Sequence, residues 1–260
     1  MKNKPKKTKG LYPKVQEMQY QRELVGLING ALSKALKEAK KSYLSIKKQY
    51  EREAGIKNDA YADRLQALDK SMRVQVTQSL STKKLKEVAL KRGITVNAKN
   101  KEALARQIKS VSTVDIFAGK DKWLKPVMKS FVSENVSLIQ NVGAQALKRA
   151  STTISMGVQR GWTLKQITKE LQKTAKFSQN KAKLIARDQV ASLNGQITKI
   201  RHKEVGINKY IWSTSLDERV RDSHLDKEGE VFSWNSPPPD TGHPGEDINC
   251  RCVAIPAIEI

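Results

Sequence analysis

The sequence predicts a mainly α-helical protein, with long helices in its N-terminal and central regions and a small α+β, loop-rich lobe at its C-terminal end. The chain of 260 residues is 38% hydrophobic but only 5% aromatic and carries 29% charged residues, a composition typical of long, solvent-exposed helices. Apolar residues recur at steps of three and four along most of the chain. This pattern stops near Gly206, where short apolar runs separated by polar and Pro/Gly segments predict strands and loops.

These patterns divide the chain into three parts. Residues 1–12 form a tail with five lysines among its first ten residues, which we expect to be disordered. Residues 13–120 form a helical, lysine-rich region. Residues 121–260 form a second domain, with helices to about residue 205 and the loop-rich lobe over residues 206–260.

The first long helix is predicted after Pro13 and should stop near Gly55, because glycine favours the left-handed conformation that ends many helices. A second helix, from about Leu65 to Leu80, should pack antiparallel to it. The stripe that predicts the first helix consists of Val25, Ile28, Leu32, Ala35, Ala39, Tyr43, Ile46 and Tyr50.

Between Thr82 and Ser110 the sequence predicts two short helices separated at Gly93. This stretch is rich in Lys and Arg, so it could be a small nucleic-acid-binding unit. A packing module with solvated lysines explains the same pattern equally well.

The central region is predicted to begin with a long helix from Asp121 to about Val158. Thr163, with Gln166 three positions later, has the spacing of a capping box and should begin the next helix. Ser178 should then cap a further helix, which ends near Gly206.

The charge of the chain is strongly asymmetric. Its formal net charge is +23, yet residues 206–260 hold 5 basic and 10 acidic residues, so residues 1–205 carry a net +28. Such an excess favours non-specific contact with a polyanion, double-stranded DNA above all, by counterion release. A basic surface without a ligand, or one that meets an acidic protein, remains an alternative.

Two features bear on the compartment of the protein. No apolar run approaches the roughly 20 residues that span a bilayer, so we expect no membrane association. Only two cysteines occur, Cys250 and Cys252, too few for a secreted disulfide framework, and this favours synthesis in a reducing compartment.

The predicted lobe holds a candidate metal site. His224, His243, Cys250 and Cys252 offer two imidazoles and two thiols, a complete tetrahedral set for zinc. A structural zinc would also explain how a lobe with so little apolar material stays ordered. The alternative is a pair of partly buried thiols beside hydrogen-bonded histidines.

A second set of lobe residues could contact a phosphate or a carboxylate of a partner. It consists of Asp217, Arg219, Arg221 and Arg251. A metal beside acidic residues and a histidine could also hydrolyse a phosphodiester, but nucleases favour hard oxygen ligands and thiols indicate a structural site. We therefore expect no catalytic residues and no enzymatic activity.

The ordered combination of lobe motifs resembles the phage Mu F-like head-morphogenesis family. The resemblance covers about residues 150–256, while the N-terminal region is similar only in its helical, lysine-rich character. It rests on the segment from Tyr210 to His224, on Gly229, Phe232, His243–Pro244–Gly245 and Asn249–Cys250–Arg251–Cys252, and on the preceding helix from Ala182 to Gln189.

The resemblance implies a minor capsid protein of a tailed bacteriophage, encoded near the portal and located in the virion after assembly in the host cytoplasm. Its expected partners are portal and capsid proteins and packaged double-stranded DNA, with a role in DNA ejection. The family's Cys/His residues correspond to His224, Cys250 and Cys252, and less closely to His243. The alternatives are a metal-dependent nuclease or toxin-like enzyme associated with the virion, and a plain cytoplasmic DNA-binding protein.

Overall fold

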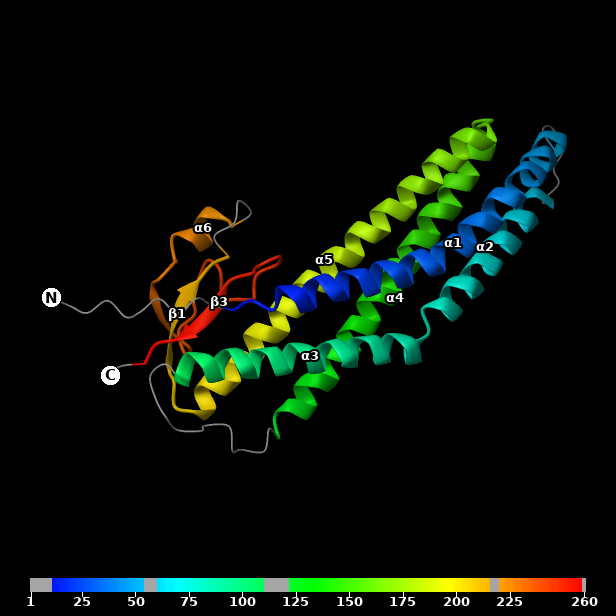
Figure 1. Ribbon diagram of the computed structural model, residues 1–260. Coiled ribbons are helices and arrows are strands. Elements are labelled where there is room, and N and C mark those ends of the chain that lie inside the picture. Colours follow the sequence, from blue (N-terminus) through cyan, green and yellow to red (C-terminus); the bar gives the residue numbers. More distant parts are fainter. Residues whose placement is uncertain (1–10, 54–59, 110–121, 216–219, 259–260) are drawn as a thin grey trace. The chain divides into compact units, whose positions relative to one another are not determined.

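The structure is a computed structural model that describes residues 11–53, 60–109, 122–215 and 220–258 (Figure 1). The described residues form long helices and one small sheet, so the predicted fold class is confirmed. The predicted disordered tail and the predicted helix stop at Gly55 lie mostly outside these residues. The elements are α1 (Lys14–Glu53), α2 (Ala60–Ser79), α3 (Thr82–Lys109), α4 (Leu124–Gln159), α5 (Leu164–Glu204), β1 (Lys209–Ser213), α6 (Asp222–Leu225), β2 (Val231–Ser233) and β3 (Val253–Pro256).

The chain separates into two compact units, each of which is described by itself. The helical unit comprises Gln21–Val88 and Ser133–Ile185. The sheet unit comprises Met1–Tyr20, Ala89–Val132 and Ala186–Ile260. The boundaries fall within helices, so the long helices contribute turns to both units.

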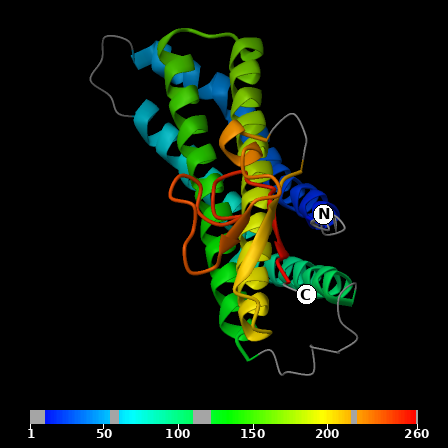
Figure 2. The same cartoon turned by 90° about the vertical axis from the view of Figure 1, so that its left-hand side faces the viewer.

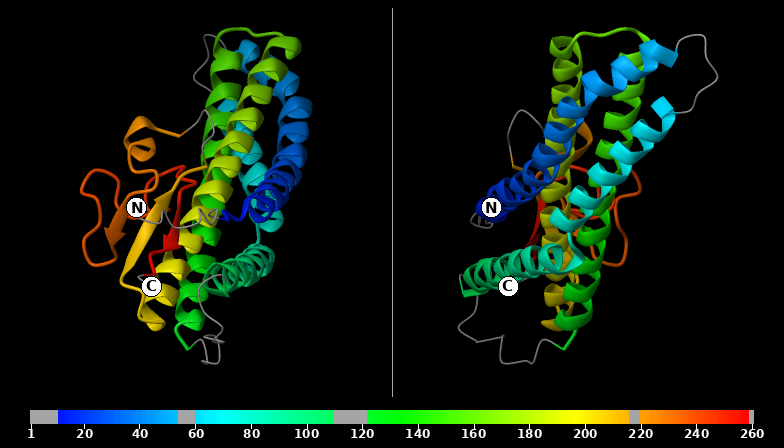
Figure 3. Two further views of the ribbon diagram at one scale, coloured as in Figure 1. Left: turned by 60° about the vertical axis from the view of Figure 1, so that its left-hand side comes forward. Right: turned by 90° about the vertical axis from the view of Figure 1, so that its right-hand side faces the viewer.

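The helical unit is a four-helix bundle built from parts of α1, α2, α4 and α5 (Figure 3). The contacts of α1 with α2 run in opposite directions along the chain, which confirms the predicted antiparallel pair. Side-chain hydrogen bonds link each helix to the next around the bundle: Glu38–Ser71 links α1 and α2, Asp69–Ser151 links α2 and α4, Gln145–Lys181 links α4 and α5, and Asn29–Gln179 links α5 and α1.

The core of this bundle comes from the apolar stripes of its helices. Tyr43, Ile154 and Ile167 are fully buried, as helical spacing predicts. Gly143 lets α4 approach α2 closely, because a Cβ there would lie 2.7 Å from a methyl group of Leu80.

Helix α5 begins as the sequence predicts. The backbone N–H of Thr163 donates to Gln166 Oε1 at 2.8 Å, and the N–H of Gln166 donates to Thr163 Oγ1 at 3.3 Å. This reciprocal pair is a capping box, which satisfies two backbone donors at the helix start.

Two predicted helix boundaries are wrong. Helix α3 runs without a break through Gly93, where the missing side chain makes room for Met128 and Phe131; a Cβ would lie 2.8 Å from Met128 Sδ. Helix α5 likewise runs through Ser178, whose hydroxyl donates to the carbonyl of Thr174 at 2.9 Å instead of capping a new helix. The predicted pair of short helices between Thr82 and Ser110 is therefore one helix.

The sheet unit contains a three-stranded antiparallel sheet in the order β2-β1-β3, seen with β1 in the middle in Figure 2. In the register, Tyr210 lies opposite Phe232 and Trp212 lies opposite Ala254. The strands that the short apolar runs after Gly206 predicted are therefore confirmed. No helix in the described part of the chain is both long and apolar enough to span a bilayer.

Candidate metal site

Three of the four predicted metal ligands meet in the sheet unit. His224 lies on the short helix α6, while Cys250 and Cys252 precede and adjoin β3. Their ligand atoms all lie within 4.8 Å of one another, and all three residues are buried. His224 Nδ1 is 3.4 Å from Cys252 Sγ and 3.6 Å from Cys250 Sγ, so one ring nitrogen faces both sulfurs.

The other ring nitrogen of His224 faces a carboxylate. Its Nε2 is 3.1 Å from Asp247 Oδ2, and Asp247 is itself paired with Arg221. In the tautomer with its proton on Nε2, the ring would donate to Asp247 and direct the lone pair of Nδ1 at the two sulfurs. A carboxylate behind a ligating histidine fixes the imidazole in this way in many metal sites.

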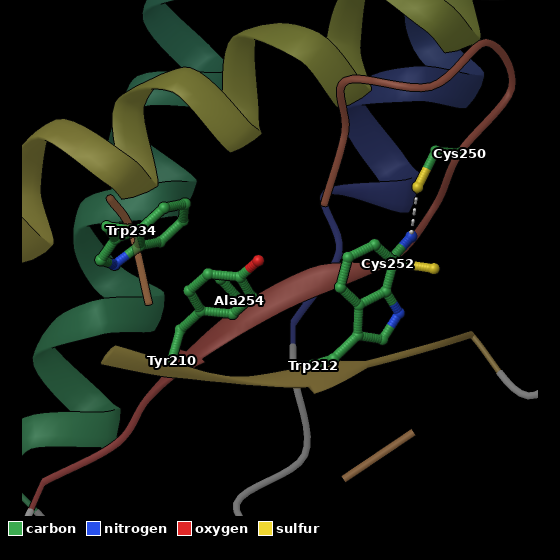
Figure 4. Close-up of a cluster of buried hydrophobic side chains, with 6 residues drawn as sticks. All are labelled: Tyr210, Trp212, Trp234, Cys250, Cys252 and Ala254. Carbon is green, nitrogen blue, oxygen red and sulfur yellow. Dashed lines mark hydrogen bonds between the residues drawn. The ribbon is translucent and has the colours of Figure 1, made fainter. Parts of the chain in front are cut away.

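The thiol of Cys250 lies in a nest of donors. The backbone N–H of Cys252 donates to its sulfur at 3.4 Å, the contact drawn in Figure 4, and the N–H of Gly245 donates at 3.5 Å. A hydrogen bond from the Cys252 thiol and these two N–H groups lower the pKa of Cys250, although burial opposes the shift. The same pairing and burial raise the pKa of Cys252. The pair therefore favours one thiolate before any ligand binds.

An aromatic wall surrounds these groups. Trp212 is fully buried, and its ring packs edge-on against His224 at 5.6 Å between centroids. Figure 4 shows Trp212 next to Cys252, while Tyr210 and Trp234 lie farther along the same buried cluster. The ring of Trp212 therefore supports the imidazole of His224 on one side.

The structure does not bring His243 into this group of ligand atoms. Its Nδ1 is 2.9 Å from the hydroxyl of Tyr210, and its ring centroid lies 5.0 Å from that of Trp234. Burial, the largest effect, and the nearby Lys199 lower the pKa of His243, so the ring favours the neutral form. Its position is that of a packed core histidine.

The turn after His243 instead brings the lobe close to α5. Gly245 has a φ of +91°, which favours glycine, and a Cβ there would lie 2.6 Å from the carbonyl oxygen of Ala191. On the helix side, a Cβ on Gly195 would lie 2.4 Å from the carbonyl oxygen of Pro244. Two glycines therefore allow direct backbone contact between α5 and this turn.

Arg251, which lies between the two cysteines, binds a buried carboxylate. It donates twice to Glu17 of α1, at 2.8 and 3.1 Å, and Arg187 of α5 adds a third contact at 3.3 Å. Glu17 is only 1% exposed. Burial alone would raise the pKa of Glu17, but the hydrogen bonds and charge of Arg251, with a smaller effect of Arg187, lower it overall.

A cavity of about 260 Å³ opens beside the ligand atoms. Arg187, Arg221 and Arg251 all line it, and each of these guanidinium groups also contacts a carboxylate. Of the predicted phosphate or partner contacts, Arg221 and Arg251 thus lie at one cavity, whereas Asp217 and Arg219 lie outside the described residues.

Comparison with known proteins finds a family that is similar to part of the chain. Residues 148–255 match the family described as phage Mu protein F like protein. The chain carries a phage Mu protein F-like region. The resemblance seen in the sequence is therefore confirmed, and the matched residues include α5, β1, β2, most of β3 and all three candidate ligands.

One curated relative adds a second similarity. The chain is 36% identical over 165 residues to an uncharacterized protein of Haemophilus influenzae, and the match covers 63% of this chain and 37% of that protein. The chain thus spans little more than a third of the relative's length. No solved structure matches the chain.

Sequence reasoning missed three residues that position the site. Glu17 lies in another part of the chain from the arginines it binds, and nothing in a helical stripe distinguishes a carboxylate that becomes buried. Asp247 could have been noticed, because acidic partners of ligating histidines are common. Gly195 carries no signal apart from being a glycine within a predicted helix.

Proposed function

We propose that the protein is a minor head component of a tailed bacteriophage, which connects the portal or the inner shell to the packaged DNA. The observation that carries this proposal is the phage Mu protein F-like match, which covers the lobe with its buried Cys/His group. The net charge of +28 over residues 1–205 supports contact with DNA. A role in DNA ejection follows if the protein lies at the portal vertex.

Within this function, His224, Cys250 and Cys252 would hold a zinc ion. Two thiols and an imidazole are ligands that zinc prefers, and the carboxylate of Asp247 behind His224 and the favoured thiolate of Cys250 suit a cation. A bound zinc would supply folding energy to a lobe whose sheet has only three short strands. The thiol ligands favour a structural role, in keeping with a head protein and not with a nuclease.

The cavity beside these ligands would be the contact for a partner. Arg221 is exposed on 46% of its side chain, and its guanidinium could exchange Asp247 for a phosphate or for a carboxylate of a portal or capsid protein. Asp217 and Arg219, which lie outside the described residues, remain proposed contacts for a phosphate or a partner. Arg251 would keep its contact with Glu17 and support the wall of the cavity.

The head-protein proposal is tested by assembling heads with and without an intact lobe. The chain would be expressed with the head genes of its own genome, DNA-filled particles purified, and the chain quantified in them by mass spectrometry. We expect the wild-type chain in purified heads and its loss with Cys250→Ala. Heads that never contain the wild-type chain would refute the proposal.

The metal proposal has its own test. We expect about one zinc per chain by elemental analysis and a lower melting temperature after chelation. His224→Ala should lose the zinc, while His243→Ala should keep it, because His243 does not face the two sulfurs. A zinc-free protein with unchanged melting after chelation would refute the site.

A further inference from the structure

The outward face of α5 in the helical unit carries a row of lysines. Ile167 and Leu171, on the opposite side of the helix, are fully buried. At 3.6 residues per turn the exposed lysines fall within an arc of about 80° and extend over about 27 Å of the helix. The row consists of Lys165, Lys169, Lys173, Lys176 and Lys183, all exposed.

Helix α1 carries a similar row in the same unit. Its members fall within an arc of about 60°, again over about 27 Å, and Tyr43 and Ile46 are buried on the other side of the helix. The row consists of Lys34, Lys37, Lys41, Lys48 and Arg52, all exposed.

These two helices are antiparallel neighbours, so the two rows flank one seam. The side chain of Asn29 accepts a hydrogen bond from Gln179 at 2.8 Å near one end of the seam. Toward the other end, the ammonium group of Lys47 donates to the carbonyl oxygens of Gly161 and Trp162 at 3.0 and 3.3 Å.

The carboxylates on these segments are already engaged. Between Leu164 and Ile185 the one acidic residue is Glu170, which pairs with Lys173 at 2.6 Å. On α1, Glu38 accepts hydrogen bonds from α2, and Glu51 pairs with Lys47 at 3.7 Å. Most lysines of the two rows therefore have no counter-ion among the described residues, and an external anion would relieve their mutual repulsion.

We propose that these two rows, on α1 and α5, form one binding surface for the sugar-phosphate backbone of duplex DNA. Lysine is a point charge on a flexible stem that suits phosphates without regard to base sequence. A row of about 27 Å can follow several consecutive phosphates. This inference rests on the DNA contact in the proposed function and assigns that contact to a place in the fold.

The test compares variants that lose the same number of lysine charges at different places in the fold. Three full-length variants each replace three exposed lysines by glutamine: the α5 variant at Lys165, Lys169 and Lys176; the α1 variant at Lys34, Lys41 and Lys48; and a control at Lys83, Lys84 and Lys86 at the start of α3. Binding to a labelled duplex of random sequence is measured by fluorescence anisotropy across a range of salt concentrations, and circular dichroism verifies the fold.

We expect the α5 and α1 variants each to bind more weakly and to lower the slope of log K against log salt by up to about 2.7, since each phosphate contact contributes about 0.9. The control, with the same net charge, should stay near the wild-type slope. If the control variant also lowered the slope, or if only one of the α5 and α1 variants did so, the proposal of one shared surface would be wrong, while DNA binding by the chain would still stand. A wild-type chain that binds no duplex even at low salt would instead refute the DNA contact in the proposed function.

Discussion

The helical unit and the sheet unit are stabilised by different kinds of contact. In the helical unit, apolar stripes fill a bundle core and lysines occupy the outside, so many similar contacts share the stability. The sheet unit is stabilised instead by a few specific contacts. These are a buried carboxylate with two arginines, a Cys/His group, and a close contact of glycine with the backbone. A directional contact is lost completely when one of its partners is replaced. We therefore expect single substitutions to cost more in the sheet unit than in the bundle.

The largest expected effect comes from Glu17. Replacing it with alanine would leave Arg251 and Arg187 partly buried without their carboxylate, and breaking a buried ion pair from one side costs about 3–5 kcal/mol. Urea unfolding measures the loss. Glu87→Ala, at an exposed site, should stay within about 0.5 kcal/mol; equal losses in the two variants would contradict a buried ion pair.

The same carboxylate predicts a pH dependence. The folded-state pKa of Glu17 is lowered, so its contribution is fully present above the unfolded pKa of about 4.3 and disappears as the pH falls through the folded value. The free energy of unfolding is measured in urea at several pH values for the wild type and for Glu17→Gln. All other carboxylates affect both proteins equally, so the difference between the two free energies reports on Glu17. Their difference should therefore shrink as the pH falls below about 4; a constant difference would contradict the lowered pKa.

A smaller loss is expected from Gly195→Ala. The added Cβ would lie 2.4 Å from the carbonyl oxygen of Pro244, so the turn that holds Gly245 must move. Overpacking of this kind costs about 1–3 kcal/mol. Urea unfolding again gives the measurement, and a protein as stable as wild type would show that the turn is free to shift.

The difference between the two units also determines how much of the structure the sequence could predict. Tyr43 on α1 and Ile167 on α5 each belong to a stripe of apolar residues at helical spacing, so the long helices can be predicted from the sequence. The spacing of Thr163 and Gln166 likewise predicts the capping box. The three strands are likewise marked by apolar runs. Gly93 and Ser178 misled because glycine often ends a helix and serine often begins one. Here packing against Phe131 and a hydrogen bond from Ser178 to the preceding turn override those preferences.

The candidate site was only partly predictable for a related reason. The residue types alone predicted His224, Cys250 and Cys252 as ligands, and the structure brings the three together. His243 has the same chemistry, but its ring bonds to Tyr210, and only the tertiary structure reveals this choice. The partnership of Glu17 with Arg251 joins residues 234 positions apart, a distance over which periodicity carries no information.

In the helical unit, removal of the cap should have a moderate effect. Thr163→Ala deletes the oxygen that accepts the N–H of Gln166, and loss of such a cap costs about 1 kcal/mol. Thermal melting followed by circular dichroism measures it. Thr163→Ser keeps the hydroxyl and should retain most of the stability, so an equal loss in the serine variant would contradict a capping role.

The smallest effect should have the opposite sign. Gly26 lies on an exposed part of α1, and a Cβ added there would have no atom within 4 Å, so alanine meets nothing. Because alanine restricts the unfolded chain more than glycine does, Gly26→Ala should stabilise the protein by about 0.5–1 kcal/mol. The same exchange at Gly195 is expected to destabilise it. If both exchanges raised the unfolding midpoint, helix propensity and not local packing would control both sites, and the contrast between the two positions would lose its physical basis.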